Sequence, residues 1–134
     1  MSETARIQEE GSLVAVAGHP KSANLTCLGL HALQHRGKET VGIISHDGSG
    51  LWAARGFGTV MSVFPSGTVD GLRGKFSIGQ IKFCRTMPLA ANVQPHMGKS
   101  KWGEMGIAFT GNIANHKELR SKLEGMGSLF FFRK

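Results

Sequence analysis

The side chains that could act as nucleophiles or metal ligands are few and scattered. The chain of 134 residues has two cysteines, Cys27 and Cys84, and six histidines. Neither cysteine has a Cys-x-x-Cys partner and the histidines stand singly, which disfavours both a disulfide scaffold and a structural zinc site. We expect no bound metal and no cofactor. A lone cysteine without a neighbouring amine is usually a small apolar packing group, and we interpret both cysteines in this way.

The charge balance is basic, with 16 Lys and Arg against nine Asp and Glu and a net charge of +7. Such a balance suggests nucleic-acid binding, but the basic residues are spread in ones and twos from Arg6 to Lys134. No apolar stretch approaches the roughly 20 residues of a membrane-spanning helix, and the N-terminus is polar and acidic, unlike a secretory signal. We therefore expect a cytoplasmic protein with no nucleic-acid partner and no membrane partner.

Short apolar runs alternate with glycines, of which the chain has 19. This pattern predicts a turn-rich domain with many short strands, and these elements must hold any functional side chains in place. Strands are predicted at 13–17, 41–45, 51–54, 76–83 and 106–109. The Asp47-Gly48 pair predicts a hairpin between the second and third of these strands. Apolar spacing predicts a helix over 21–36, and Asn115 followed by Glu118 predicts the start of another helix, which Gly127 ends.

A β-rich run over 128–132 lies at the C-terminus of the sequence. It predicts either the edge of a domain that has been cut short or a terminal strand tucked into the sheet. In the first case Phe130, Phe131 and Phe132 would promote aggregation at an exposed edge. The residues alone favour neither interpretation.

Five short motifs follow one another in order between about residues 9 and 127. They are Leu33-Gln34-His35-Arg36-Gly37, Arg55-Gly56-Phe57-Gly58, Ile78-Gly79-Gln80-Ile81, Ala91-Asn92-Val93-Gln94-Pro95 and Gly111-Asn112-Ile113-Ala114-Asn115. With these motifs the sequence resembles the glutamine amidotransferase domain of the amidophosphoribosyltransferase family. Five ordered matches are much harder to obtain by chance than one short motif.

The resemblance implies an α+β fold of the N-terminal-nucleophile hydrolase type, in which helices flank two stacked, mainly antiparallel sheets as αββα layers. It divides the chain into a leader at 1–10 and a partial type 2 glutamine amidotransferase domain at 11–134, with no phosphoribosyltransferase domain. We expect the layered sandwich to be incomplete. In the family, an N-terminal cysteine attacks glutamine beside an oxyanion hole, and the released ammonia enters the first step of purine biosynthesis.

The positions that match the family's catalytic residues depart from its pattern. Gly11 follows Glu-Glu, where the family has its nucleophile, and glycine supplies none. The oxyanion-hole position reads Thr110-Gly111, which keeps the backbone donor but replaces the asparagine. The family's glutamine-binding arginine matches Lys82, which keeps the charge without bidentate recognition of a carboxylate. The family's acidic substrate-binding residue would fall beyond the last residue.

Several other polar residues match the family without an assigned chemical step. Arg36, Asn92 and Gln94 are expected to support the pocket, although Arg36 fits equally well as a capping cation at a helix C-terminus. We interpret His35 as a hydrogen-bonded structural group and not as a base. Ser12 does not replace the nucleophile, because a shift of one residue along a strand turns the side chain to the opposite face.

The sequence is thus interpreted as an amidophosphoribosyltransferase-like glutamine amidotransferase domain that is catalytically inactive as an isolated chain. One alternative is weak glutamine hydrolysis in complex with a separate synthase chain. Two others are a non-catalytic binding or regulatory module and a non-functional gene fragment. The expected partners are glutamine, bound weakly, and either a second copy of the chain or a partner chain of the family.

Overall fold

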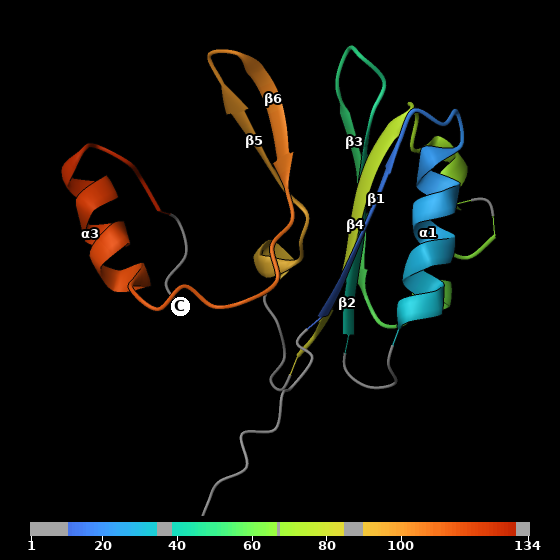
Figure 1. The fold of residues 1–134 in the computed structure, drawn as a ribbon, viewed down its shortest axis with the longest axis horizontal. Coiled ribbons are helices and arrows are strands. Elements are labelled where there is room, and N and C mark those ends of the chain that lie inside the picture. Colours follow the sequence, from blue (N-terminus) through green and yellow to red (C-terminus); the bar gives the residue numbers. More distant parts are fainter. Residues whose placement is uncertain (1–10, 35–38, 67, 85–89, 131–134) are drawn as a thin grey trace, which may run out of the picture.

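The computed structural model describes residues 11–34, 39–66, 68–84 and 90–130, and a four-stranded antiparallel sheet lies at its centre. The strands of this sheet lie in the order β1-β4-β2-β3. Their bounds are β1 Gly11–Ala17, β2 Glu39–His46, β3 Leu51–Phe57 and β4 Phe76–Phe83. Helix α1, Ser22–Leu33, covers one face, and a hairpin of β5, His96–Ser100, and β6, Gly103–Ile107, lies over the other (Figure 1).

The face of the sheet beneath α1 forms the hydrophobic core. Leu30 of α1 is fully buried against Val41 and Ile43 of β2. The helix can approach this closely because β4 carries glycine at position 79. A Cβ atom there would lie only 2.6 Å from Thr26 Cγ2 and 2.7 Å from Leu30 Cδ1. Burial of these branched side chains supplies the main cohesion of this layer.

The predicted hairpin between β2 and β3 is confirmed by both pairing and turn geometry. Gly48 has a φ of +93°, a left-handed conformation that glycine adopts without strain. The Asp47 carboxylate accepts hydrogen bonds from the backbone N–H groups of Ser49 at 2.9 Å and Gly50 at 3.0 Å. These bonds, with those from the Ser49 hydroxyl and the Trp52 indole, hold the pKa of Asp47 well below its usual range.

The segment just before β5 and strand β6 approach the other face of the sheet closely at glycines. A Cβ atom on Gly42 would collide with the Gln94 carbonyl oxygen and lie 3.0 Å from Pro95 Cδ. Further along, Gly106 of β6 packs against the side chain of Ile44. The predicted strand at 106–109 is displaced, since β6 ends at Ile107, and β5 was not predicted because its residues lack an alternating apolar pattern.

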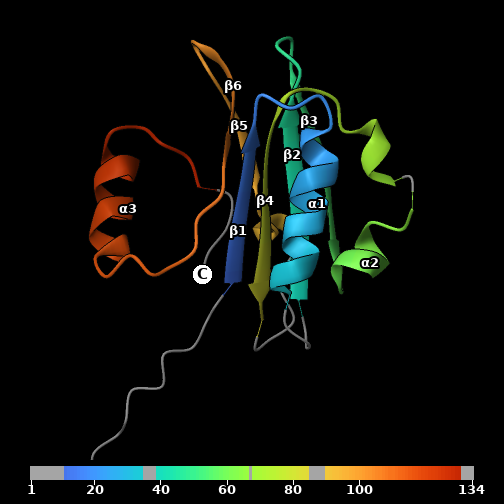
Figure 2. The same cartoon turned by 45° about the vertical axis from the view of Figure 1, so that its right-hand side comes forward.

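Helix α3, His116–Gly125, stands apart from the sheet and has no buried residue (Figure 2). It begins where predicted, but the expected capping box is not formed, because the Asn115 side chain makes no capping hydrogen bond. Gly127, with a φ of +91°, ends the helix as predicted. Residues 128–130 form no strand, contrary to prediction, and the rest of that predicted strand lies outside the described residues.

Three short helical segments complete the described ranges. They are α2 Val60–Val63, the 3₁₀ turn η1 Thr68–Gly71 and the 3₁₀ turn η2 Ala90–Asn92. No helix in the described ranges is long and apolar enough to cross a membrane. The predicted α+β class with antiparallel sheets is confirmed.

Candidate functional site

Two of the residues predicted from the family pattern lie opposite each other on neighbouring strands. Gly11 begins β1, and its register partner on β4 is Lys82. Lys82 is also the partner of Thr40 on β2, so it lies between the two strands. Directly opposed residues of antiparallel strands have Cα atoms about 4.5–5.5 Å apart. The sheet therefore brings Gly11, the predicted nucleophile position, next to Lys82, the predicted substrate-binding position.

The neighbouring hydroxyl of Ser12 belongs to the other face of the sheet. Ser12 pairs with Ile81, which is buried in the core beneath α1. Val14, two residues further along β1, contacts α1 at Gly29, and alternate residues of a strand share a face. Ser12 therefore points toward the α1 layer and away from Lys82, as the strand argument predicted.

The segment that carries the oxyanion-hole position is held by two glutamine side chains. Gln80 of β4 donates from Nε2 to the Phe109 carbonyl oxygen at 2.6 Å. The Phe109 N–H donates to Oε1 of Gln94 at 2.7 Å. The backbone N–H and carbonyl oxygen of Phe109 are thus both hydrogen-bonded, immediately before Thr110 and Gly111. We call this pair of contacts the glutamine clasp.

Beyond the glutamine clasp, Thr110 and Gly111 are exposed. Gly111 has a φ of +134°, and a Cβ atom there would lie 3.3 Å from Phe109 Cζ. This conformation favours glycine, which lacks the Cβ atom that would strain it. Gln80 and Lys82 are alternate residues of β4 and share a face, which places this segment beside the Gly11 end of the sheet.

The other polar residues that were matched to the family differ in their contacts with the site. Gln94 contacts the site through the glutamine clasp. Asn92 is exposed on η2, and its side chain forms no hydrogen bond with any residue in the described ranges. Arg36 and His35 lie outside the described residues. Sequence reasoning missed the role of Gln80, although a polar residue within the apolar strand 76–83 was a usable signal.

Two positive charges lie near His96 on the sheet face that carries the candidate site. The pKa of His96 is lowered, first by burial and then by the positive charges of Arg55 and Lys82. Neither Arg55 nor Lys82 forms an ion pair with a carboxylate of the described residues. An anionic group would therefore be attracted to this part of the sheet face.

The two cysteines lie in different surroundings. Cys27 packs partly buried against the core, and burial raises the pKa of its thiol. This confirms the expectation that Cys27 is a packing residue. Cys84 is half-buried, with its Sγ 3.8 Å from the Lys82 carbonyl oxygen.

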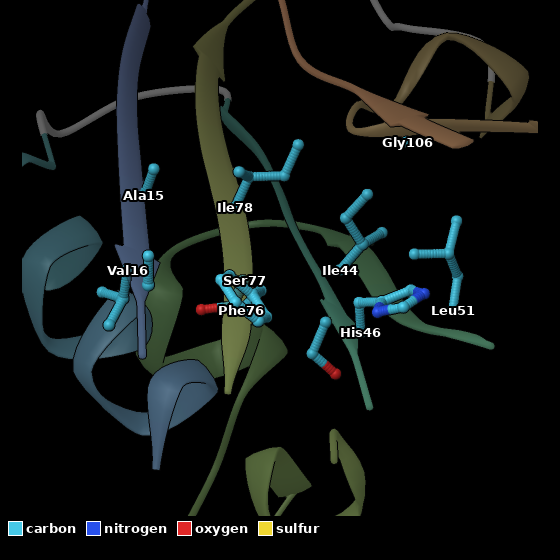
Figure 3. A pocket seen from close by; sticks show the side chains of 11 residues that line it. Ala15, Val16, Ile44, His46, Leu51, Phe76, Ser77, Ile78 and Gly106 are labelled. Atoms are coloured by element: carbon cyan, nitrogen blue, oxygen red, sulfur yellow. The ribbon is translucent and has the colours of Figure 1, made fainter. Parts of the chain in front are cut away.

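An apolar hollow of about 290 Å³ lies between the sheet and β6, at the far ends of the strands from Gly11 (Figure 3). Its walls include Ala15, Ile44, Phe76 and Ile78, and Gly106 of β6 lies above them. None of the positions matched to the family's catalytic residues lines this hollow. The hollow and the candidate site are therefore separate features of the same sheet face.

Comparisons with known proteins give consistent results. No family model matches the chain. Amidophosphoribosyltransferase 3, chloroplastic, of Arabidopsis thaliana is 37% identical over 131 residues, which cover 97% of this chain and 25% of that protein. The amidophosphoribosyltransferase of Bacillus subtilis is 35% identical over 132 residues, covering 97% of this chain and 28% of that protein. The chain thus spans about a quarter of the length of these relatives.

Two solved structures resemble the described fold. One is the glutamine phosphoribosylpyrophosphate amidotransferase of B. subtilis complexed with ADP and GMP, with a TM-score of 0.79. The other is described as the allosteric regulatory enzyme of purine biosynthesis, with a TM-score of 0.82. Each is 36% identical and matches 90% of this chain and 26% of its own. These likenesses confirm the expected N-terminal-nucleophile hydrolase fold.

Proposed function

We propose that this chain, a homologue of the glutamine amidotransferase domain of amidophosphoribosyltransferases, binds glutamine weakly and does not hydrolyse it. The observation that carries the proposal is the pairing of Gly11 with Lys82. The strand position that requires a nucleophile has no side chain, while the cation that would attract the substrate's carboxylate lies beside it. The chain would thus keep a group that attracts the substrate and lack the group that reacts with it.

The local backbone also supports the loss of the nucleophile. A Cβ atom on Gly11 would collide with the carbonyl oxygen of Ile81 and lie 3.3 Å from Lys82 Cα. A side chain at this position therefore requires β1 to shift against β4. The nearest hydroxyl, on Ser12, points to the opposite face of the sheet.

The features that remain favour binding of an amino acid. Lys82 offers a positive charge, and the glutamine clasp holds the Phe109 peptide so that the Thr110-Gly111 segment stays close to the sheet. A single lysine binds a carboxylate less specifically than the bidentate fork of an arginine. Weak affinity is therefore the expected consequence.

Two measurements test the proposal. Ammonia release from glutamine by the purified chain should not exceed that of a heat-treated sample. Glutamine should perturb the backbone amide resonances of Lys82 and Gly111, and Lys82→Gln should weaken this response. Lys75→Gln, which removes a charge at the other end of β4, is the matched control and should leave the response unchanged.

Two results would overturn the proposal. The first is ammonia release that disappears in Ser12→Ala or in Cys84→Ala, because it would identify a working nucleophile. The second is the absence of any perturbation at high glutamine concentration. The lack of a nucleophile at Gly11 is also tested by intact mass, since residues 4–10 should then stay attached.

A further inference from the structure

Two cations lie on the sheet face that carries the candidate site, on strands that are not neighbours. Ala54 of β3 packs against the core beneath α1, and Ile81 of β4 is part of that core. Successive residues of a strand point to opposite faces, so Arg55 and Lys82 both point away from α1. The glutamine clasp and the Gly11 position belong to this same face.

The pairing of the strands sets the distance between the two cations. Arg55 is the register partner of Gly42 on β2, and Lys82 is the partner of Thr40 on the same strand. Strand β2 lies between β3 and β4 (Figure 2). With strands about 4.8 Å apart and residues about 3.4 Å apart along a strand, the Cα atoms of Arg55 and Lys82 are about 12 Å apart. Both side chains are long enough to carry their charges well away from the backbone, toward a common ligand.

No carboxylate of the described residues forms an ion pair with either cation. Arg55 is exposed and Lys82 is half-buried. The carboxylate of Glu39 belongs to the other face, because Glu39 shares its face of β2 with Val41, which is buried beneath α1. Burial and then the charges of Arg55 and Lys82 lower the pKa of His96, so the two positive fields overlap at one imidazole. An anionic ligand would reduce this repulsion.

We infer that Arg55 is a second anion-binding residue of this site, so that the site favours an amino acid with a second acidic group over glutamine. The inference rests on the proposed function, which places the α-carboxylate of the ligand at Lys82. The side-chain carboxylate of an acidic amino acid such as glutamate then meets Arg55, whose planar guanidinium can bind it with two hydrogen bonds. The uncharged carboxamide of glutamine gains no such ion pair.

The separation of the two cations is the reason to choose a dicarboxylic amino acid over a phosphate group. A phosphate is compact, and its sites direct several donors at one point. Arg55 and Lys82 instead start from strands that have β2 between them. Their charges therefore suit two acidic groups that a short carbon chain holds apart.

A comparison of glutamate with glutamine at pH 7.5 tests the inference, because the two amino acids then differ in the charge of one group. Glutamate should bind the unmodified chain about three- to fivefold more tightly, which is the gain expected of one partly exposed ion pair. The backbone amide resonance of Arg55 should shift with glutamate and not with glutamine. Arg55→Gln should remove the preference without changing the affinity for glutamine, whereas Lys82→Gln should weaken binding of both.

The matched control is Arg73→Gln, which removes the same charge beside the Trp52 ring, at the end of the sheet away from Gly11. This variant should keep the preference for glutamate. Equal affinity for the two amino acids, a preference that persists in Arg55→Gln, or an equal loss in Arg73→Gln would overturn the inference. The first of these results is measured on the unmodified chain and does not depend on the folding of a variant. Inorganic phosphate that binds more tightly than glutamate and requires Arg55 would replace the dicarboxylic amino acid as the ligand.

The same titrations separate this inference from the proposed function. Glutamine binding without a preference for glutamate would contradict the inference and leave the proposed function standing. A response to glutamate that requires Arg55, with none to glutamine, would contradict the proposed function and support the inference. No response to either amino acid would contradict both.

Discussion

The two faces of the four-stranded sheet differ sharply in how they are covered. Beneath α1, Leu30, Val41 and Ile43 are fully shielded from solvent. On the opposite side, Met105 and Ile107 of the hairpin are each 60% exposed, and α3 buries no residue. The molecule therefore has one closed apolar layer, and a second layer that lies over the sheet without a closed core of its own.

The contrast shows that the two layers differ in how much apolar packing holds them. The α1 layer is held by apolar burial, which scales with the area removed from water. The hairpin layer combines polar contacts, namely the glutamine clasp and the bond from Leu51 N–H to Glu104, with close packing of Gly106 against Ile44 and of Pro95 against Gly42. A hydrogen bond contributes only about 0.5–1.5 kcal/mol net. We therefore expect the hairpin and α3 to open at lower free energy than the α1 layer.

The largest expected effect on stability comes from replacing a leucine with alanine, once in the α1 layer and once in the second layer. Leu30→Ala should lower the free energy of unfolding by about 3 kcal/mol, because it leaves a cavity in the core. Leu123→Ala on α3, where the side chain is 42% exposed, should lower it by less than about 0.5 kcal/mol. Urea denaturation of the two variants measures the difference. Similar losses in both would mean that the second layer is as cohesive as the first.

A smaller effect is expected from breaking the glutamine clasp. Gln80→Leu keeps the side-chain volume but leaves the Phe109 carbonyl oxygen without its donor, which should cost about 1–2 kcal/mol. Amide hydrogen exchange at Phe109, whose N–H donates to Gln94, should accelerate, because this segment loses its contact with β4. Gln34→Leu is the matched control, since Gln34 accepts a hydrogen bond from Val60 N–H near the α1 layer. If the control accelerates exchange at Phe109 equally, the clasp does not position the segment.

Much of the α1 layer could be predicted from the sequence. Its elements were predicted from the apolar runs at 13–17, 41–45 and 76–83 and from the helical spacing after Lys21. These patterns are informative because the apolar side chains that form them are the ones that become buried. In the second layer the sequence predicted α3 and only the end of β6. β5 is a strand because it pairs with β6, and its residues alone give no periodic signal.

The candidate site likewise has features that the sequence predicts and features that it does not. Strand alternation was enough to predict that Ser12 and Gly11 point to opposite faces. The register that pairs Gly11 with Lys82 depends on two strands far apart in the sequence, and the family resemblance assigned both residues to one site without predicting this pairing. The glutamine clasp could not be derived, because a hydrogen bond between Gln80 and a backbone group 29 residues away is set by the packing of the hairpin.

The smallest expected effect concerns pH, and it tests the electrostatics of the hairpin layer alone. The pKa of His96 in the folded chain is lowered by burial and by the charges of Arg55 and Lys82, so the unfolded chain binds a proton more readily. Stability should then be complete above the unfolded pKa of about 6.5 and decline as the pH falls from there through the lowered folded value. Arg55→Gln should reduce this decline and His96→Gln should remove this residue's contribution, whereas Lys75→Gln should not change it. Urea midpoints measured from pH 7.5 to pH 5 provide the test, and a decline that is the same in His96→Gln would show that His96 does not carry it.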